Sequence, residues 1–239
     1  MNDLGNVAEP GSGPMFDRIA SRYDLLNRII SLGLDRGWRR RTARALELEP
    51  DGCVLDLATG TADLALELAA TYPTARVVGL DEAPRMLAIG ASKIGRLGLG
   101  ARVELVRGDA SELPFAGGSF DACSMAFGIR NMADRVRVLA EMRRVLRPGG
   151  KVAILELTDP GRGWLGLLAH YHVHGLVPWV GAVLSGGEAY RYLSHSIAAF
   201  PPPDQFLGLL SAVGFERPRV EAMTWGVAHL YLGYVGGAA

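Results

Sequence analysis

The chain is of medium length, electrically neutral and apolar enough for a large core. It has 239 residues, 49% of them hydrophobic, and a formal net charge of +0, which excludes bulk electrostatic attraction to nucleic acid. The length is that of one large α/β domain. Cys53 and Cys123 lie in apolar strand-like runs, so we expect reduced core thiols of a cytoplasmic protein, with a disulfide or metal pair as the alternative.

The N-terminal region divides into a polar leader and a helical part. Residues 1–13 are rich in glycine and polar residues and lack the apolar stretch of a signal peptide, which predicts a disordered leader. We expect residues 14–239 to form one domain, beginning with N-terminal helices across 14–48. There, apolar residues recur three or four positions apart, and SLGLDRG separates two helices.

Strands and helices alternate through the rest of the chain. Apolar runs predict strands at 53–58, 75–81, 102–110, 119–128 and 151–157, the last one following an RPGG turn. Helical periodicity predicts helices at 59–72, 83–99, 135–146 and 203–215, and the runs 216–224 and 227–235 predict a closing antiparallel pair. This order is typical of an α/β fold with a doubly wound, mostly parallel seven-stranded sheet and helices on both faces.

An apolar segment interrupts this alternation. Residues 163–187 contain no Asp, Glu, Lys or Arg and are long enough for a membrane span. Three histidines, Pro178 and several glycines argue against a span. We therefore expect an inserted helical lid at 161–198, made of buried or interfacial helices, which forms the acceptor side of the site.

Acidic residues follow three neighbouring strands of the predicted sheet. Ligands of such sheets bind beyond the carboxyl ends of the strands, where the strand order reverses. Asp56 ends the first strand and suits a cationic ligand, and Gly60 allows a tight turn. Asp81 is placed to accept both hydroxyls of a ribose, and Asp109 to bond an adenine amino group with Ala110 leaving room for the ring.

Each of these signals has a structural alternative. An aspartate at a strand end is often only the N-cap of the next helix. Three of them at consecutive strand ends favour a nucleoside ligand. The turn DLATGTAD is not GxGxxG, and an acid there would repel phosphates, so the pattern favours S-adenosylmethionine over NAD.

Several further blocks are more distinctive than the strand ends. They are MFDRIASRYDLLNRIISLGLDRGWRR, VLDLATGTAD, GLDEAPRML, GDASELPF, FGIRNMAD with EMRRVLRPGGKVAILEL, YRYLSHSIAAFP and TWGVAHLYLGY. In these blocks the chain resembles the C-methyltransferases of ubiquinone and menaquinone biosynthesis. The resemblance implies a class I methyltransferase-type fold, S-adenosylmethionine as cofactor, and C-methylation of a polyprenyl hydroquinone, converting demethylmenaquinol to menaquinol.

The resemblance also assigns cofactor contacts. It makes Thr61 the threonine of the glycine turn, Asp81 the ribose acid, and Asp109 with Ala110 the adenine pair. Ala62 stands where the family usually has glycine, so this residue is strained if its backbone needs a positive φ.

Six other positions depart from the family pattern, among them Pro202 and Pro203, which alter the stretch after FP. Ala126 replaces a serine of some members, and Asp35 replaces a common histidine. Tyr231 and Leu232 replace a usual His-Arg pair near the C-terminus. The last three changes bear on which quinol is accepted.

The Arg-Asn pair after the fourth strand is expected to face the acceptor. The implied reaction requires a phenolate whose ring carbon attacks the methyl group in line. We expect Arg130 to stabilise that phenolate and Asn131 to hold a ring oxygen or a water. The alternative is that Arg130 only braces the loop through an ion pair with Asp134 or Glu156.

The general base is the least determined part of the site. His174 is the preferred candidate; a helix would place His170 on the same side, and a strand would place His170 and His172 on the same face. Tyr23, Tyr190 and Tyr192 are other candidates for contacting the quinol oxygens. We expect no metal, because the chemistry needs none.

The expected partner is a polyprenyl quinol from the bilayer, and no nucleic acid. The protein is expected in the cytoplasm, with peripheral contact at the inner membrane face and a homodimer left open. WRRRTAR (38–44) is either a headgroup contact or a solvated helix face. Two other functions stay in play: methylation of another acceptor, such as a phospholipid amine, and a catalytically silent cofactor-binding scaffold.

Overall fold

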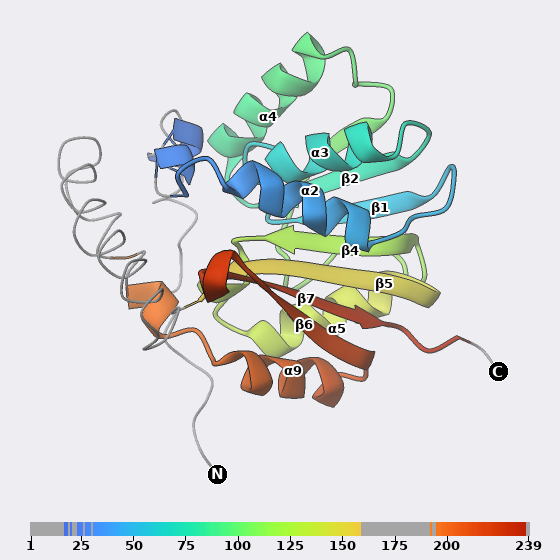
Figure 1. The fold of residues 1–239 in the computed structure, drawn as a ribbon. Helices are drawn as coiled ribbons and strands as arrows, with labels where there is room; N and C mark the ends of the chain where they lie inside the picture. Colours follow the sequence, from blue (N-terminus) through green and yellow to red (C-terminus); the bar gives the residue numbers. More distant parts are fainter. Residues whose placement is uncertain are drawn as a thin grey trace.

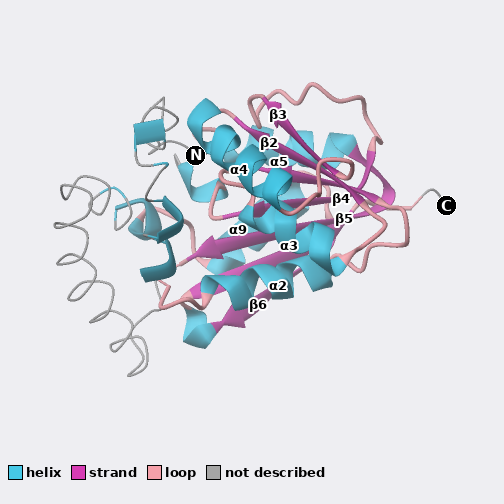
Figure 2. Ribbon diagram, turned by 90° about the horizontal axis from the view of Figure 1, so that it is seen from above, coloured by secondary structure: helices cyan, strands magenta, loops and turns pink. Residues whose placement is uncertain are grey.

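The chain forms one seven-stranded sheet with helices packed over both faces (Figure 1, Figure 2). The computed structural model describes residues 17–18, 20, 23–25, 27–29, 31–158, 192 and 195–237. The strands are β1 (Cys53–Leu57), β2 (Arg76–Asp81), β3 (Val103–Arg107), β4 (Phe120–Ala126), β5 (Leu146–Leu157), β6 (Glu216–Met223) and β7 (Ala228–Tyr234). The longer helices are α2 (Asp35–Ala45), α3 (Asp63–Thr71), α4 (Pro84–Arg96), α5 (Arg135–Val145) and α9 (Pro203–Ala212).

The order of the strands is that of a doubly wound sheet. It runs β3-β2-β1-β4-β5-β7-β6, with parallel pairing through β5 and antiparallel pairing of β7 with β5 and β6. The chain order therefore reverses between β1 and β4, which places a crevice at their carboxyl ends. The predicted class I methyltransferase-type sheet is confirmed.

The two faces of the sheet are buried by different helices. On β1, Val54 packs with residues of α2 and α3, whereas Leu55 and Leu57 pack with residues of α5 and α9. Neighbouring positions of a strand point to opposite faces, and helices cover both faces of the sheet. All three side chains are therefore fully buried. A strand buried on both faces reads as a continuous apolar run, as CVLDLA does.

The largest difference from the predicted elements is the start of β5. The RPGG stretch was expected to be a turn before the strand, but β5 begins at Leu146 and includes it. The reason lies in the C-terminal chain. The N–H of Gly149 donates to the carbonyl of Val235 at 2.9 Å, and the N–H of Val235 donates to Gly150 at 2.9 Å, so the ladder continues past the glycines.

The helical N-terminal part of the prediction is present where the structure describes it. Residues described between 17 and 29 are helical, and α2 follows. Trp38 of α2 donates from Nε1 to Thr224 Oγ1 at 2.9 Å, which ties α2 to the turn between β6 and β7. The leader 1–13 and nearly all of the insertion 161–198 lie outside the described residues. Both cysteines are free thiols. None of the helices that the structure describes has the length and apolar character needed to cross a bilayer.

Candidate cofactor and acceptor site

A cavity of about 350 Å³ lies at the carboxyl ends of β1 to β4. Its wall includes residues at or just after the ends of these strands, among them Ala58, Asp81, Asp109 and Phe127. This is the crevice expected where the strand order reverses. A smaller pocket of about 20 Å³ adjoins it and shares Gly60 with it.

Asp81 lies in the cavity wall with its carboxylate held by the backbone. Its Oδ2 accepts from the N–H of Gly60 at 2.8 Å, and its Oδ1 accepts from the N–H of Ala83 at 2.9 Å. Burial raises the pKa of this carboxyl, although these backbone donors act in the opposite direction. Each oxygen keeps a further lone pair, so the held carboxylate can still accept a ligand hydroxyl.

Asp109 and Ala110 lie together in the same wall, after β3. The Oδ1 of Asp109 accepts from the N–H of Ser111 at 2.7 Å, which fixes the carboxylate in an Asx turn. Gly108 packs closely on Leu80, since a Cβ added at Gly108 would lie 2.9 Å from Leu80 Cδ1. Both residues line the cavity beside Asp109 and Ala110.

Asp56 faces the smaller pocket rather than the larger cavity. It is 1% exposed, and its two oxygens accept from the hydroxyls of Thr59 at 2.7 Å and Ser124 at 2.8 Å. Burial raises the pKa of Asp56 to about 6, against the effect of the two hydroxyl donors and the Arg39 charge. A cation bound nearby would favour its ionised form.

Three non-glycine residues beside the cavity have left-handed backbone conformations. Ala58, Ala62 and Phe127 have φ of 49°, 67° and 59°. Gly60, between Ala58 and Ala62, has a φ of 54°. Such conformations cost free energy for residues with a Cβ and often lie at functional sites. The predicted strain at Ala62 is therefore present.

The charge of the wall fits S-adenosylmethionine better than a phosphate-bearing nucleotide. Four acids lie in the wall of the larger cavity: Asp81, Glu82, Asp109 and Asp134. Arg137 is the one basic side chain among the wall residues that the structure describes. An acidic cavity attracts a sulfonium and an ammonium and repels phosphates.

Arg130 departs from its expected position. Its guanidinium is not among the described groups that line the cavity, and its side chain is only 7% exposed. Nη1 donates to Glu156 Oε1 and to the carbonyl of Phe127 at 2.9 Å, and its backbone N–H donates to Glu156 Oε2 at 3.1 Å. Of the two carboxylates proposed as loop-bracing partners, the structure selects Glu156, because the fully buried Glu156 lies on the adjacent β5.

Asn131 lies in the cavity wall where Arg130 does not. Its Oδ1 accepts from the hydroxyl of Tyr192 at 3.2 Å, so the Arg-Asn loop contacts the segment that carries YRYLSHS. Arg135 donates from Nη2 to the carbonyl of Arg130 at 2.9 Å and holds the same loop. His174, with the neighbouring histidines, lies outside the described residues, and none of the described histidines lines the cavity.

Tyr231, one of the departures from the family pattern, lies behind this loop. Its side chain is fully buried against Phe206, with ring centroids 4.6 Å apart. Its hydroxyl has no hydrogen-bond partner among the described residues. Burial, with the Glu156 charge nearby, raises the pKa of this phenol well above its usual range.

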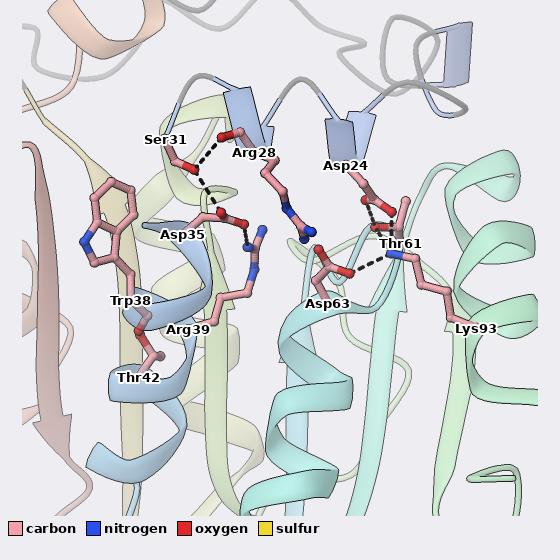
Figure 3. A network of polar contacts seen from close by, with 10 residues as sticks. All are labelled: Asp24, Arg28, Ser31, Asp35, Trp38, Arg39, Thr42, Thr61, Asp63 and Lys93. Carbon is pink, nitrogen blue, oxygen red and sulfur yellow. Dashed lines mark hydrogen bonds and ion pairs between the residues drawn. The ribbon is translucent and has the colours of Figure 1, made fainter. Parts of the chain in front are cut away.

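Thr61 and Asp35 lie in a polar network that the sequence did not indicate (Figure 3). Thr61 Oγ1 donates to Asp24 and accepts from Lys93. Asp35 accepts from Ser31 Oγ at 2.8 Å and from Arg39. Although burial alone would raise the pKa of Asp35, these donors lower it overall.

Three of the four arginines of WRRRTAR have carboxylate partners within the chain. Arg39 pairs with Asp35, Arg40 with Glu67 at 3.1 Å, and Arg41 with Glu221 at 2.6 Å. The motif is thus used internally, and the headgroup contact receives no support from these three side chains. The part of the chain that the structure describes contains no cluster of metal-ligating side chains.

Comparison with known proteins gives one consistent family. The model of the ubiE/COQ5 methyltransferase family matches residues 6–235. A demethylmenaquinone methyltransferase of Thermus thermophilus is 47% identical over 92% of this chain and 99% of its own. A ubiquinone/menaquinone biosynthesis C-methyltransferase UbiE of Geotalea daltonii is 41% identical over 92% and 94% of the two chains.

Solved structures support the fold at much lower identity. The [4+2]-cyclase SpnF aligns with a TM-score of 0.72 at 18% identity, over 98% of this chain and 100% of its own. An S-adenosylmethionine-dependent methyltransferase of Aquifex aeolicus aligns with a TM-score of 0.59, also at 18% identity, over 82% and 89%. With the cavity described above, the chain belongs to the ubiE/COQ5 methyltransferase family and is an S-adenosylmethionine-dependent C-methyltransferase.

Proposed function

We propose that the protein methylates a ring carbon of a polyprenyl hydroquinone, with demethylmenaquinol as the acceptor and menaquinol as the product. The observation that carries this proposal is the 47% identity to the demethylmenaquinone methyltransferase of Thermus thermophilus, together with an acidic cavity at the strand ends. When bound, S-adenosylmethionine supplies the electrophilic methyl group.

The residues of this chain have separate roles in the proposal. Asp81 accepts the ribose hydroxyls, and Asp109 with Ala110 receives the adenine. Asn131 orients a ring oxygen of the acceptor, because its amide lies in the wall. Arg130 positions the Asn131 loop through Glu156 instead of contacting the phenolate. His174 stays a prediction as the group that removes the phenolic proton.

In this proposal, the quinol acceptor reaches the site from a membrane. The quinol dissolves in the bilayer, so we propose a cytoplasmic protein that contacts the membrane surface peripherally. Exposed Trp225 in the β6–β7 turn and exposed Leu32 before α2 support such contact. Tryptophan and leucine favour the interfacial region of a bilayer.

The test is an incubation of the purified protein with S-adenosylmethionine and either demethylmenaquinol or the demethylated benzoquinol, under reducing conditions. Mass spectrometry should show one added methyl on the naphthoquinol ring carbon. An amine acceptor serves as a third arm, since Glu156 neutralises Arg130 and removes the charge that would repel it. Methylation of the amine alone, or cofactor binding without turnover on any acceptor, would contradict the proposal.

A further inference from the structure

The N-terminal strap, defined as the described residues from 17 to 31, borders the larger cavity. Tyr23 lines both the larger cavity and the smaller pocket. Ala20 packs against Met86, which is also part of the cavity wall. The carboxylate of Asp17 accepts from the backbone N–H of Arg85 at 3.0 Å. The strap thus supplies one side of the space in which the cofactor must lie.

One lysine joins this strap to two helices of the sheet domain (Figure 3). Lys93 Nζ of α4 lies 2.5 Å from Asp24 Oδ2 of the strap and 2.6 Å from Asp63 Oδ1 of α3. It also donates to Thr61 Oγ1 at 3.0 Å, and that hydroxyl donates to Asp24 Oδ1 at 2.5 Å. The Lys93 side chain is only 15% exposed, so water screens these contacts weakly.

The same cation also prevents a repulsion. Without Lys93, the carboxylates of Asp24 and Asp63 would lose the one cation with which both form ion pairs among the described residues. Two like charges without this cation disfavour the closed arrangement. Apolar contacts hold the strap at Ala20 and Tyr23, whereas Leu25, on the other side of Asp24, is 53% exposed.

We infer that Lys93 is a positioning residue for cofactor binding, which holds the N-terminal strap closed over the cavity through Asp24 and Thr61. The inference rests on the cofactor of the proposed function and not on its acceptor. A ligand held by the closed form binds with an apparent affinity that falls with the closed fraction. Opening of the strap therefore limits how long the cofactor stays bound.

The test uses the full chain with S-adenosylmethionine and S-adenosylhomocysteine as probes. Lys93→Met and Asp24→Asn should each raise the Kd by calorimetry at least about fivefold. Both should also speed ligand dissociation in stopped-flow experiments and raise the KM for S-adenosylmethionine more than they lower kcat. Lys93→Arg keeps the charge and should recover most of the affinity.

Two matched controls separate a latch from a general loss of charge. Lys151→Met removes a lysine that pairs with Glu47 at 2.8 Å and does not line the cavity, and it should bind with wild-type affinity. Asp63→Asn cuts only the link between α3 and α4, so its Kd should change much less than that of Asp24→Asn.

Wild-type Kd and dissociation rate in both Lys93→Met and Asp24→Asn would overturn the inference. An equal loss of affinity in Asp63→Asn and Asp24→Asn would also overturn it, since the strap would then not be the cause. Thermal unfolding of the ligand-free variants is measured in parallel, and a cooperative transition is required before their affinities are compared. A wild-type protein that binds the cofactor but methylates no quinol refutes the proposed acceptor and leaves this test intact.

Discussion

The acids after β1 to β3 and the Arg-Asn loop after β4 lie at the same edge of the sheet, yet they hold their charges differently. Asp81 and Asp109 are fixed by backbone N–H donors and keep lone pairs toward the cavity. Arg130 instead forms an ion pair with the buried Glu156, and of the Arg-Asn pair only Asn131 lines the cavity. A charged residue in a motif can therefore shape a site without facing it.

The largest effect should come from cutting the Arg130–Glu156 pair. Arg130→Met leaves Glu156 buried with backbone donors alone, so the free energy of unfolding should fall by about 3–5 kcal/mol. Urea denaturation of the ligand-free protein measures this change. Arg40→Met is the control, because Arg40 forms an exposed pair with Glu67 and should cost about 0–1 kcal/mol. Unchanged stability with lost turnover would instead place Arg130 at the acceptor.

The second largest effect should be on cofactor affinity, through Asp81. Asp81→Ala removes the acceptor proposed for two ribose hydroxyls, and hydrogen bonds to a charged group contribute about 1.5–3 kcal/mol each. The Kd for S-adenosylmethionine should therefore rise about 100-fold or more by calorimetry. A folded Arg130 variant should bind the cofactor nearly as the wild type does. A similar loss of cofactor affinity in both variants would contradict the separate roles given to Asp81 and to the Arg-Asn loop.

The buried carboxyl of Asp56 can be tested by the pH dependence of stability. Its pKa is about 6 in the folded protein and near 3.8 when unfolded, so the folded state binds more protons between these values. The contribution of Asp56 to stability should decrease as the pH rises from about 4 to 6, by roughly 1–3 kcal/mol, so the wild type should lose stability relative to Asp56→Asn across this range. Parallel unfolding curves for wild type and variant across that range would contradict the raised pKa.

The smallest effect concerns the strained turn. Ala62→Gly relieves a left-handed conformation that costs about 1–2 kcal/mol and loses one buried methyl of about 0.8 kcal/mol, so stability should stay equal or rise slightly. Ala65→Gly is the matched control, since Ala65 is equally buried but helical. It should lose about 1–2 kcal/mol. Equal losses in thermal unfolding would mean that Ala62 is not strained.

Most of the fold could be predicted from local patterns. Apolar runs and helical periodicity located every strand of the sheet, and the alternation of elements predicted its parallel part. The start of β5 could not be predicted, because RPGG reads locally as a turn. Its inclusion in the strand depends on pairing with Val235, which is remote in the sequence, even though Gly149 keeps a turn-like φ of 80°.

The site divides in the same way. Parallel strands bring their carboxyl ends to one edge, so Asp81, Asp109 and Ala110 could be placed in a common cavity from order alone. The direction of the Arg130 side chain depends on a buried carboxylate 26 residues away, and the sequence offered Asp134 equally well. Lys93 gave no signal, because a lysine on an amphipathic helix normally faces solvent.

The most direct test of the whole account is a crystal structure of the protein with S-adenosylhomocysteine. The ribose should lie on Asp81, the adenine beside Asp109 and Ala110, and the Arg130 guanidinium should still contact Glu156. A nucleoside bound away from the ends of β1 to β3, or an Arg130 released from Glu156 into the cavity, would contradict it.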